Sequence, residues 1–173
     1  MKRENFFRPS EEVRDPYHYT ACGLQNIYLL NGYDFGEHDG ERHVFIRSLD
    51  ALHQAIGRHL VLKRKALTGA EIKFLRKTID LTQEELAEAL GNNAQSIARW
   101  EKGQITIPGD AEKLLRVVFF ARLTTEEELR ALRDLIVDGL VELDAFDEDV
   151  TPCASFTLNE TWTEQARPVA VCC

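Results

Sequence analysis

Residues 81–103 read Leu-Thr-Gln-Glu-Glu-Leu-Ala-Glu-Ala-Leu-Gly-Asn-Asn-Ala-Gln-Ser-Ile-Ala-Arg-Trp-Glu-Lys-Gly, and this stretch decides the fold of the middle of the chain. Thr82, with Glu85 three residues later, forms a capping box that starts a helix. Apolar residues then recur at helical spacing. Gly91 stands where the chain must turn, in a left-handed conformation that only glycine adopts without penalty. The sequence therefore predicts a helix over 83–90 and a sharp turn after it.

A second helix follows this turn. Asn93 is suited to cap it, and Ile97 and Trp100, three residues apart, form its apolar face. Ala87 in the first helix is small enough to let the two helices approach closely. The outward face of the second helix carries the residues Ala94, Gln95, Ser96, Arg99 and Lys102. We interpret the segment as a helix-turn-helix, because too many independent positions fit that motif for an ordinary helical hairpin.

With these residues the segment resembles the Xre/Cro-type helix-turn-helix family. The resemblance rests on Leu81, Gln83, Leu86, Ala87, Gly91, Ile97, Arg99, Trp100, Glu101 and Gly103. It covers residues 66–121 when a preceding helix, opened by the capping box of Thr68 and Glu71, and a following helix after Pro108 are included. The Arg-Trp-Glu-Lys-Gly ending, behind a separate amino-terminal region, is also similar to MqsA-type antitoxins, whose DNA-binding half is carboxy-terminal.

The resemblance implies a set of DNA contacts. Gln83 would bind a backbone phosphate, since the free amides and dipole of a helix N-terminus attract anions. Gln95 and Arg99 would contact bases, as glutamine matches adenine and arginine matches guanine in the major groove; for Gln95 a solvated surface role remains the alternative. Ala94 lacks the polar group that many family members carry there, and would instead touch a thymine methyl. Phosphate contacts are expected from Asn93, Ser96 and Lys102.

The charge of the chain is unevenly distributed. The net charge is -8, from 21 Lys and Arg against 29 Asp and Glu, whereas DNA-binding domains are usually basic. Residues 1–65 hold 10 basic and 9 acidic side chains, 66–121 hold 7 and 8, and 122–173 hold 4 and 12. The acidic excess thus follows the motif. Twenty residues with one acid contain Arg58, Lys63, Arg64, Lys65, Lys73, Arg76 and Lys77, which would lie along a phosphate backbone or form a solvated charge run.

Composition limits the class of protein. A chain of 173 residues with 44% hydrophobic content can bury the core of one domain or two small ones. No apolar run approaches the length of a membrane span, and the start lacks a secretory h-region, so we expect a cytoplasmic protein. The four cysteines are too scattered for a disulfide scaffold and are expected to be reduced. No nucleotide loop or paired catalytic carboxylates are visible, which argues against an enzyme.

The amino-terminal region differs from the helical middle. Strands are predicted over 26–33 and 43–47, joined by a glycine-rich acidic loop over 34–41. A helix is predicted over 48–61, with Ser48 as a possible cap. Two strands bury too little to be stable alone, so we expect them to pack on this helix or pair with a second copy. Residues 1–64 would then form a small α+β domain for dimerisation or partner binding.

A metal site was considered in the same region, because MqsA-type antitoxins carry zinc on paired cysteines there. This chain has no such pair and offers only His18, Cys22, His38 and His43. We expect no zinc and no other cofactor, and Cys22 to behave as a small buried residue. A catalytic Cys-His pair is disfavoured, because no third, orienting group is identified.

The remaining chain is predicted to be mostly helical. A helix after Pro108 closes the DNA-binding core, and a further helix over 125–140 presents an apolar stripe that is either core or a dimer seam. The fold class is therefore α+β, mainly α: an amino-terminal strand pair with a helix, then a five-helix domain over 65–142. Residues 143–173 form an acidic linker and tail without clear periodicity, expected to be disordered or ordered by pairing with a partner.

These expectations converge on a sequence-specific transcriptional regulator. The favoured form is a homodimeric repressor of its own operon, with two recognition helices in successive major grooves of a palindromic operator. The alternative is the antitoxin of a type II toxin-antitoxin pair, with a protein toxin as its main partner and autoregulation as a second role.

Overall fold

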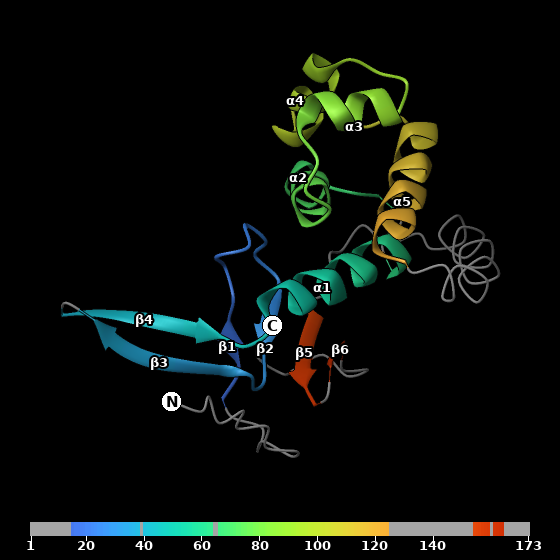
Figure 1. Cartoon of the computed structure of the whole chain (residues 1–173). Helices are drawn as coiled ribbons and strands as arrows, with labels where there is room; N and C mark the ends of the chain where they lie inside the picture. Colours follow the sequence, from blue (N-terminus) through green and yellow to red (C-terminus); the bar gives the residue numbers. More distant parts are fainter. Residues whose placement is uncertain (1–14, 39, 64–65, 125–153, 160, 165–173) are drawn as a thin grey trace, which may run out of the picture.

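The computed structural model describes residues 15–38, 40–63, 66–124, 154–159 and 161–164, and it has mixed α and β structure (Figure 1). The predicted helix over 125–140 and the acidic segment 144–151 lie outside the described residues. Among the described residues, no helix is long and apolar enough to cross a membrane. The elements in chain order are β1 (Tyr17–His18), β2 (Ile27–Leu29), β3 (Tyr33–His38), β4 (Glu41–Ile46), α1 (Leu49–Lys63), α2 (Gly69–Thr78), α3 (Gln83–Ala89), α4 (Ala94–Glu101), α5 (Gly109–Leu123), β5 (Ala154–Leu158) and β6 (Trp162–Glu164).

A four-stranded sheet of order β1-β2-β5-β6 joins the two ends of the described chain. Strand β5 runs parallel to β2, with Ile27 opposite Ala154 and Leu29 opposite Phe156, whereas β1 and β6 are antiparallel to their neighbours. The side chains of Ile27, Leu29 and Phe156 are fully buried. The tail was expected to be disordered or to pair with a partner, and its described part instead pairs with the same chain.

The predicted strand over 26–33 is shorter in the structure, because Asn31 replaces backbone pairing with side-chain hydrogen bonds. The amide nitrogen of Asn31 donates to the carbonyl of Leu158 at 3.2 Å, and its side-chain oxygen accepts from the backbone N–H of Leu158 at 2.6 Å. Gly32 follows with a φ of +74°, and a Cβ there would lie 2.5 Å from the ring of Trp162. The chain therefore leaves the sheet at this point.

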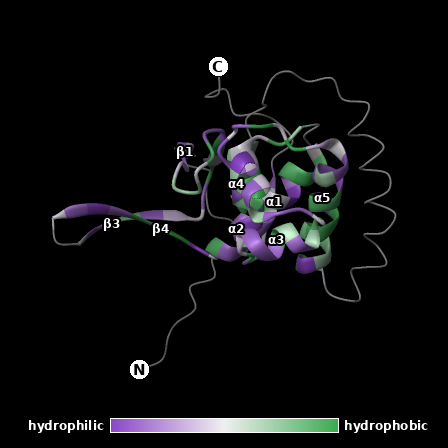
Figure 2. Ribbon diagram, turned by 90° about the horizontal axis from the view of Figure 1, so that it is seen from above, coloured by the Kyte–Doolittle hydropathy of each residue, from purple (hydrophilic) through white to green (hydrophobic). Residues whose placement is uncertain are grey.

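Strands β3 and β4 form a separate two-stranded hairpin that extends away from the helices in both views (Figures 1 and 2). Strand β4 confirms the prediction over 43–47, but the loop predicted over 34–41 is wrong, since most of it is β3 and pairs with β4 in register from Tyr33–Ile46 to His38–Glu41. Acidic residues and Gly36 disfavour strands in isolation, so cross-strand pairing overrode local propensity here. The expected partnership of β2 with β4 is also wrong, because β2 pairs with β1 and β5.

Helix α1, predicted over 48–61, covers the four-stranded sheet. Leu52, Ile56 and Leu60 repeat every four residues and are fully buried, which places them on one face of the helix. The same region of α1 contacts the tail through His59, whose Nδ1 lies 2.9 Å from Glu164 Oε2 and whose ring meets that of Phe156 edge-on. Helix α1 is thus the link between the sheet and the rest of the molecule.

Helix α5 packs on the other side of α1. A Cβ on Gly57 would lie 2.2 Å from the Phe119 ring, so a glycine is needed for this close approach. The fully buried Arg116 donates from Nη1 to the carbonyls of Leu60 and Val61, at 3.0 and 2.6 Å, and pairs with Glu112. These contacts satisfy carbonyls at the carboxyl end of α1, which lack partners within the helix.

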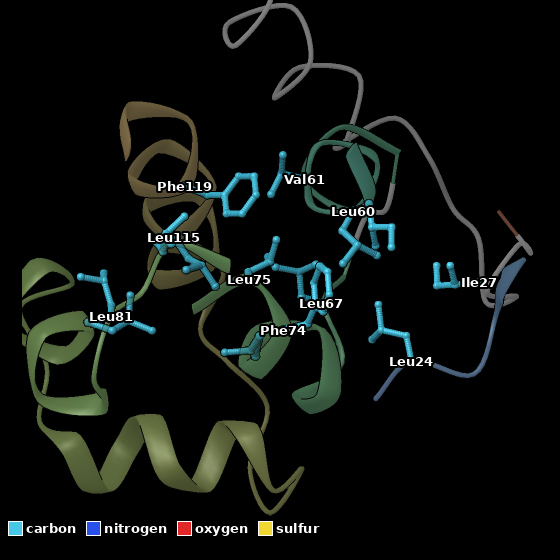
Figure 3. Packing of buried hydrophobic residues seen from close by; sticks show 14 of the residues in the cluster. Leu24, Ile27, Leu60, Val61, Leu67, Phe74, Leu75, Leu81, Leu115 and Phe119 are labelled. Carbon is cyan, nitrogen blue, oxygen red and sulfur yellow. The ribbon is translucent and has the colours of Figure 1, made fainter. Parts of the chain in front are cut away.

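A single hydrophobic core runs through these elements. Figure 3 shows side chains of β2, α1, α2 and α5 meeting in it, from Ile27 through Leu60 and Leu75 to Phe119. Phe156 and Trp162 of the tail belong to the same cluster. The sequence predicted a boundary near residue 64 and a separate tail after 142, and the described residues on both sides of these boundaries share one core.

The burial of Phe156 yields a stability prediction. Replacing Phe156 with Ala should destabilise the protein by about 3 to 5 kcal/mol, because it removes a fully buried ring and leaves a cavity. Chemical denaturation followed by circular dichroism would measure this loss. The exposed Thr161 of the same tail is the control, and Thr161→Ala should change stability by less than about 0.5 kcal/mol. Equal effects of the two substitutions would contradict the place of the tail in the core.

Candidate nucleic-acid interface

The first helix of the motif begins at the predicted capping box. The backbone N–H of Glu85 donates to the Thr82 hydroxyl at 3.1 Å, and the backbone N–H of Thr82 donates to Glu85 Oε2 at 2.7 Å. Hydrogen bonds to the Glu85 carboxyl from the backbone N–H and the side chain of Thr82 hold the pKa of Glu85 below its ordinary value. Thr68 and Glu71 form the same box at the start of α2. Both predicted capping boxes are confirmed.

The turn between α3 and α4 is also as predicted. Gly91 has a φ of +61°, and the backbone N–H of Asn92 closes the helix end by donating to the carbonyl of Ala87 at 2.8 Å. Asn93 then caps α4, since its side-chain oxygen accepts from the backbone N–H of Ser96 at 2.9 Å. The Asn93 side chain therefore already accepts a hydrogen bond at the start of α4, where the sequence predicts a contact with a DNA phosphate.

Helix α4 has one buried and one exposed face. Ile97 and Trp100 are 0% and 3% exposed and fix the inner face. The side chains of Gln95, Arg99 and Lys102 are exposed, whereas Ala94 and Ser96 are half-buried. The structure thus gathers the residues expected to contact bases on one short helix. It offers hydrogen-bond donors and acceptors in a form that fits the major groove.

A buried carboxylate holds α4 in place. Glu101, whose side chain is 4% exposed, accepts two hydrogen bonds from Arg76 of α2, at 2.5 Å from Nε and 3.1 Å from Nη2. The amide nitrogen of Gln83 in α3 donates to the same carboxylate at 2.8 Å. Arg76 also donates from Nη1 to the carbonyl of Leu81 at 2.7 Å. One carboxylate therefore ties together the three helices of the motif.

This network changes the interpretation of two residues. Arg76 belongs to the basic stretch expected to follow a phosphate backbone or to form a solvated charge run, and it instead pairs with Glu101 inside the domain. The side chain of Gln83 is half-buried and held at Glu101, so any phosphate contact must come from that fixed position. Sequence reasoning did not assign Glu101 a role, although its spacing of four residues from Ile97 places it on the inner face of α4.

Close backbone packing adds to this constraint. Gly69, at the start of α2, lies so near the end of α4 that a Cβ would be 2.4 Å from the carbonyl oxygen of Trp100 and 2.7 Å from that of Glu101. Backbone atoms cannot move aside as a flexible side chain can. The glycine therefore sets the distance between the two helices.

Two of the candidate metal ligands, His18 and Cys22, make other contacts. His18 Nε2 lies 2.6 Å from the carbonyl oxygen of Gln25, and its ring stacks on Tyr28. The Cys22 thiol donates to the carbonyl of Tyr19 at 3.4 Å. Within the described ranges, no group of three or more His, Cys, Asp or Glu residues is placed to hold a metal ion.

Comparison with known proteins addresses this part of the chain. Residues 72–116, from α2 into α5, match the family model described as Helix-turn-helix. The segment is similar to that family, and the match covers 45 of the 173 residues. No curated protein and no solved structure matches the chain. The match supports the Xre-type resemblance, and the similarity to MqsA-type antitoxins is not shown.

The Glu101 network yields a second prediction. Glu101→Gln should destabilise the domain by about 3 kcal/mol or more, because it leaves the charge of Arg76 poorly compensated in a mostly buried site. Thermal unfolding, together with the fluorescence of the neighbouring Trp100, would report the loss. Glu88→Gln on the exposed surface of α3 is the matched control and should have little effect. A Glu101→Gln protein as stable as the parent would show that the ion pair does not constrain α4.

Proposed function

We propose that this protein is a sequence-specific DNA-binding transcriptional regulator. The observation that carries the proposal is the exposed polar face of α4, with Gln95 and Arg99 outward while Ile97 and Trp100 anchor the helix from within. The helix-turn-helix match over residues 72–116 supports the same function. Recognition of the major groove requires a helix that is held in place and presents hydrogen-bonding groups, as α4 does.

In this proposal α4 lies in the major groove. Gln95 and Arg99 contact adenine and guanine edges, and the half-buried Ala94 touches a thymine methyl. The phosphate contacts come from Gln83, Asn93, Ser96 and Lys102, which lie at the starts of α3 and α4 and just after the end of α4. Because Glu101 holds the Gln83 side chain, the phosphate contact at α3 is already oriented before DNA binds.

Two substitutions on this surface separate base contacts from phosphate contacts. Arg99→Ala should remove about 1 to 3 kcal/mol of discrimination at one base position of each half-site. Lys102→Ala should weaken binding to all sequences alike and reduce the salt dependence by about one phosphate contact. Fluorescence anisotropy on the DNA upstream of the gene and on scrambled DNA, at two salt concentrations, would measure both effects. Equal losses on the two DNAs for Arg99→Ala would contradict base recognition.

We further propose that the regulator is a homodimer that represses its own operon through a palindromic operator. The β3–β4 hairpin supports dimerisation, since Phe35 and Phe45 are 53% and 60% exposed. In the observed register, Phe35 is opposite Val44 and Phe45 is opposite Asp34, so the two rings lie on opposite faces of the hairpin. A two-stranded sheet is marginally stable alone. A second copy of the chain packed on either face would bury one of these rings.

The dimer proposal predicts the effect of a double substitution. Phe35→Ser with Phe45→Ser should convert the dimer to a monomer in sedimentation velocity and weaken binding to the full palindrome more than to a half-site. Leu114→Ser on α5 removes a comparably exposed apolar residue far from the hairpin and should leave the dimer intact. A double variant that remains dimeric would place the interface elsewhere.

The antitoxin of a type II pair remains the alternative function. The antitoxin alternative relied in part on a tail that binds a protein partner. In the described part of the tail, β5 pairs with β2 of the same chain and with β6 of the tail itself. Copurification with a small ribonuclease-sized partner would favour the antitoxin, whereas purification without such a partner would favour the plain regulator.

A further inference from the structure

A cavity of about 500 Å³ lies between the loop that joins β1 to β2 and helices α1 and α2. Figure 1 shows this loop rising from the sheet toward α2. The cavity has the size of a small-molecule site. Its lining residues are Ala21, Cys22, Gly23, His53, Ala70, Lys73, Phe74, Lys77, Thr78 and Glu101. The proposed DNA contacts use none of these side chains.

The charge of the cavity comes from two lysines. Lys73 and Lys77 are exposed and four residues apart, which places them one above the other on the same face of α2. Neither side-chain ammonium forms an ion pair or hydrogen bond with another described residue. The carboxylate of Glu101 is already compensated by Arg76. As far as the described residues show, the wall formed by α2 therefore carries two positive charges without an ion-pair partner.

The opposite wall is neutral. The Tyr19 hydroxyl lies 2.9 Å from His53 Nε2, and burial lowers the pKa of His53, so its ring is uncharged at neutral pH. Burial raises the pKa of the Cys22 thiol, which therefore stays protonated at neutral pH. On α2 itself, Phe74 supplies an aromatic surface, and its ring meets that of His53 edge-on. The site thus combines a cationic edge with both polar and apolar lining side chains.

We propose that this cavity binds a small anionic ligand, whose carboxylate or phosphate group contacts Lys73 and Lys77 and whose uncharged part packs against Phe74, His53 and Cys22. A phosphate of DNA is the alternative anionic group that Lys73 and Lys77 could contact. The small ligand is favoured because the lysines border a cavity between a loop and two helices. Since Glu101 is also part of the wall, an occupant would touch the residue that holds α4. Any change that this occupant causes in DNA affinity depends on the DNA-binding function proposed above.

Alkylation of Cys22 tests the charge of the cavity without a known ligand. Iodoacetate is anionic and iodoacetamide is neutral, so the ratio of their rate constants at Cys22 reports local potential and cancels the fraction of thiolate. Peptide mass spectrometry resolves Cys22 from the other cysteines. At low salt and pH about 8.5, where lysines remain charged, this ratio should be roughly fivefold higher in the parent than in Lys73→Ala with Lys77→Ala.

Two further measurements complete the test. Inorganic phosphate, at constant ionic strength, should slow iodoacetate alkylation of Cys22 in the parent but not in the double variant. Lys113→Ala on α5 is the matched lysine control and should behave as the parent in both assays. An equal alkylation ratio in parent and double variant, or the absence of phosphate protection in the parent, would overturn the proposal.

DNA binding distinguishes the two sources of phosphate. If Lys73 and Lys77 contact DNA, the double variant should lower the slope of log affinity against log salt by about two phosphate contacts. That result would overturn the small-ligand site. An unchanged slope together with phosphate protection at Cys22 would support it. The alkylation assays do not use DNA, so they decide the cavity proposal even if the protein fails to bind an operator.

Discussion

The carboxylate of Glu101 is the constraint on which the proposed DNA-reading surface depends. It accepts hydrogen bonds from Arg76 of α2 and Gln83 of α3, while its own backbone ends α4. A buried ion pair is not in itself strong evidence of stability, since desolvation offsets much of the attraction. Its geometry is nevertheless directional, because a guanidinium forks onto a carboxylate in one plane. The pair therefore fixes the orientation of α4 more than it adds to stability.

The rest of the fold supplies a rigid base for this motif. Arg116 caps the carboxyl end of α1 from within α5, and Gly57 lets the Phe119 ring approach α1 closely. Helix α1 also rests on the sheet, where His59 contacts Phe156 and Glu164. The helix-turn-helix segment, α1 and the sheet thus share one core.

The candidate site was predictable where its signals are local. The capping box of Thr82 and Glu85, the turn at Gly91 and the cap at Asn93 each depend on residues within four positions of one another. The roles of Arg76 and Glu101 were not found, because 25 residues separate them and each also reads as an ordinary surface charge. The same holds for the cavity, whose lining combines residues from a loop, two helices and the end of α4.

By itself, the sequence determined the order of α1 to α5, their approximate bounds and which face of α4 is buried, because helical periodicity and capping act within a few residues. Only the tertiary structure decided the pairing of β5 with β2, more than a hundred residues apart, and the conversion of the expected loop over 34–41 into a strand. Strand pairing is a contact between distant segments, and short strands such as Ile27–Leu29 carry too little periodicity to name their partners.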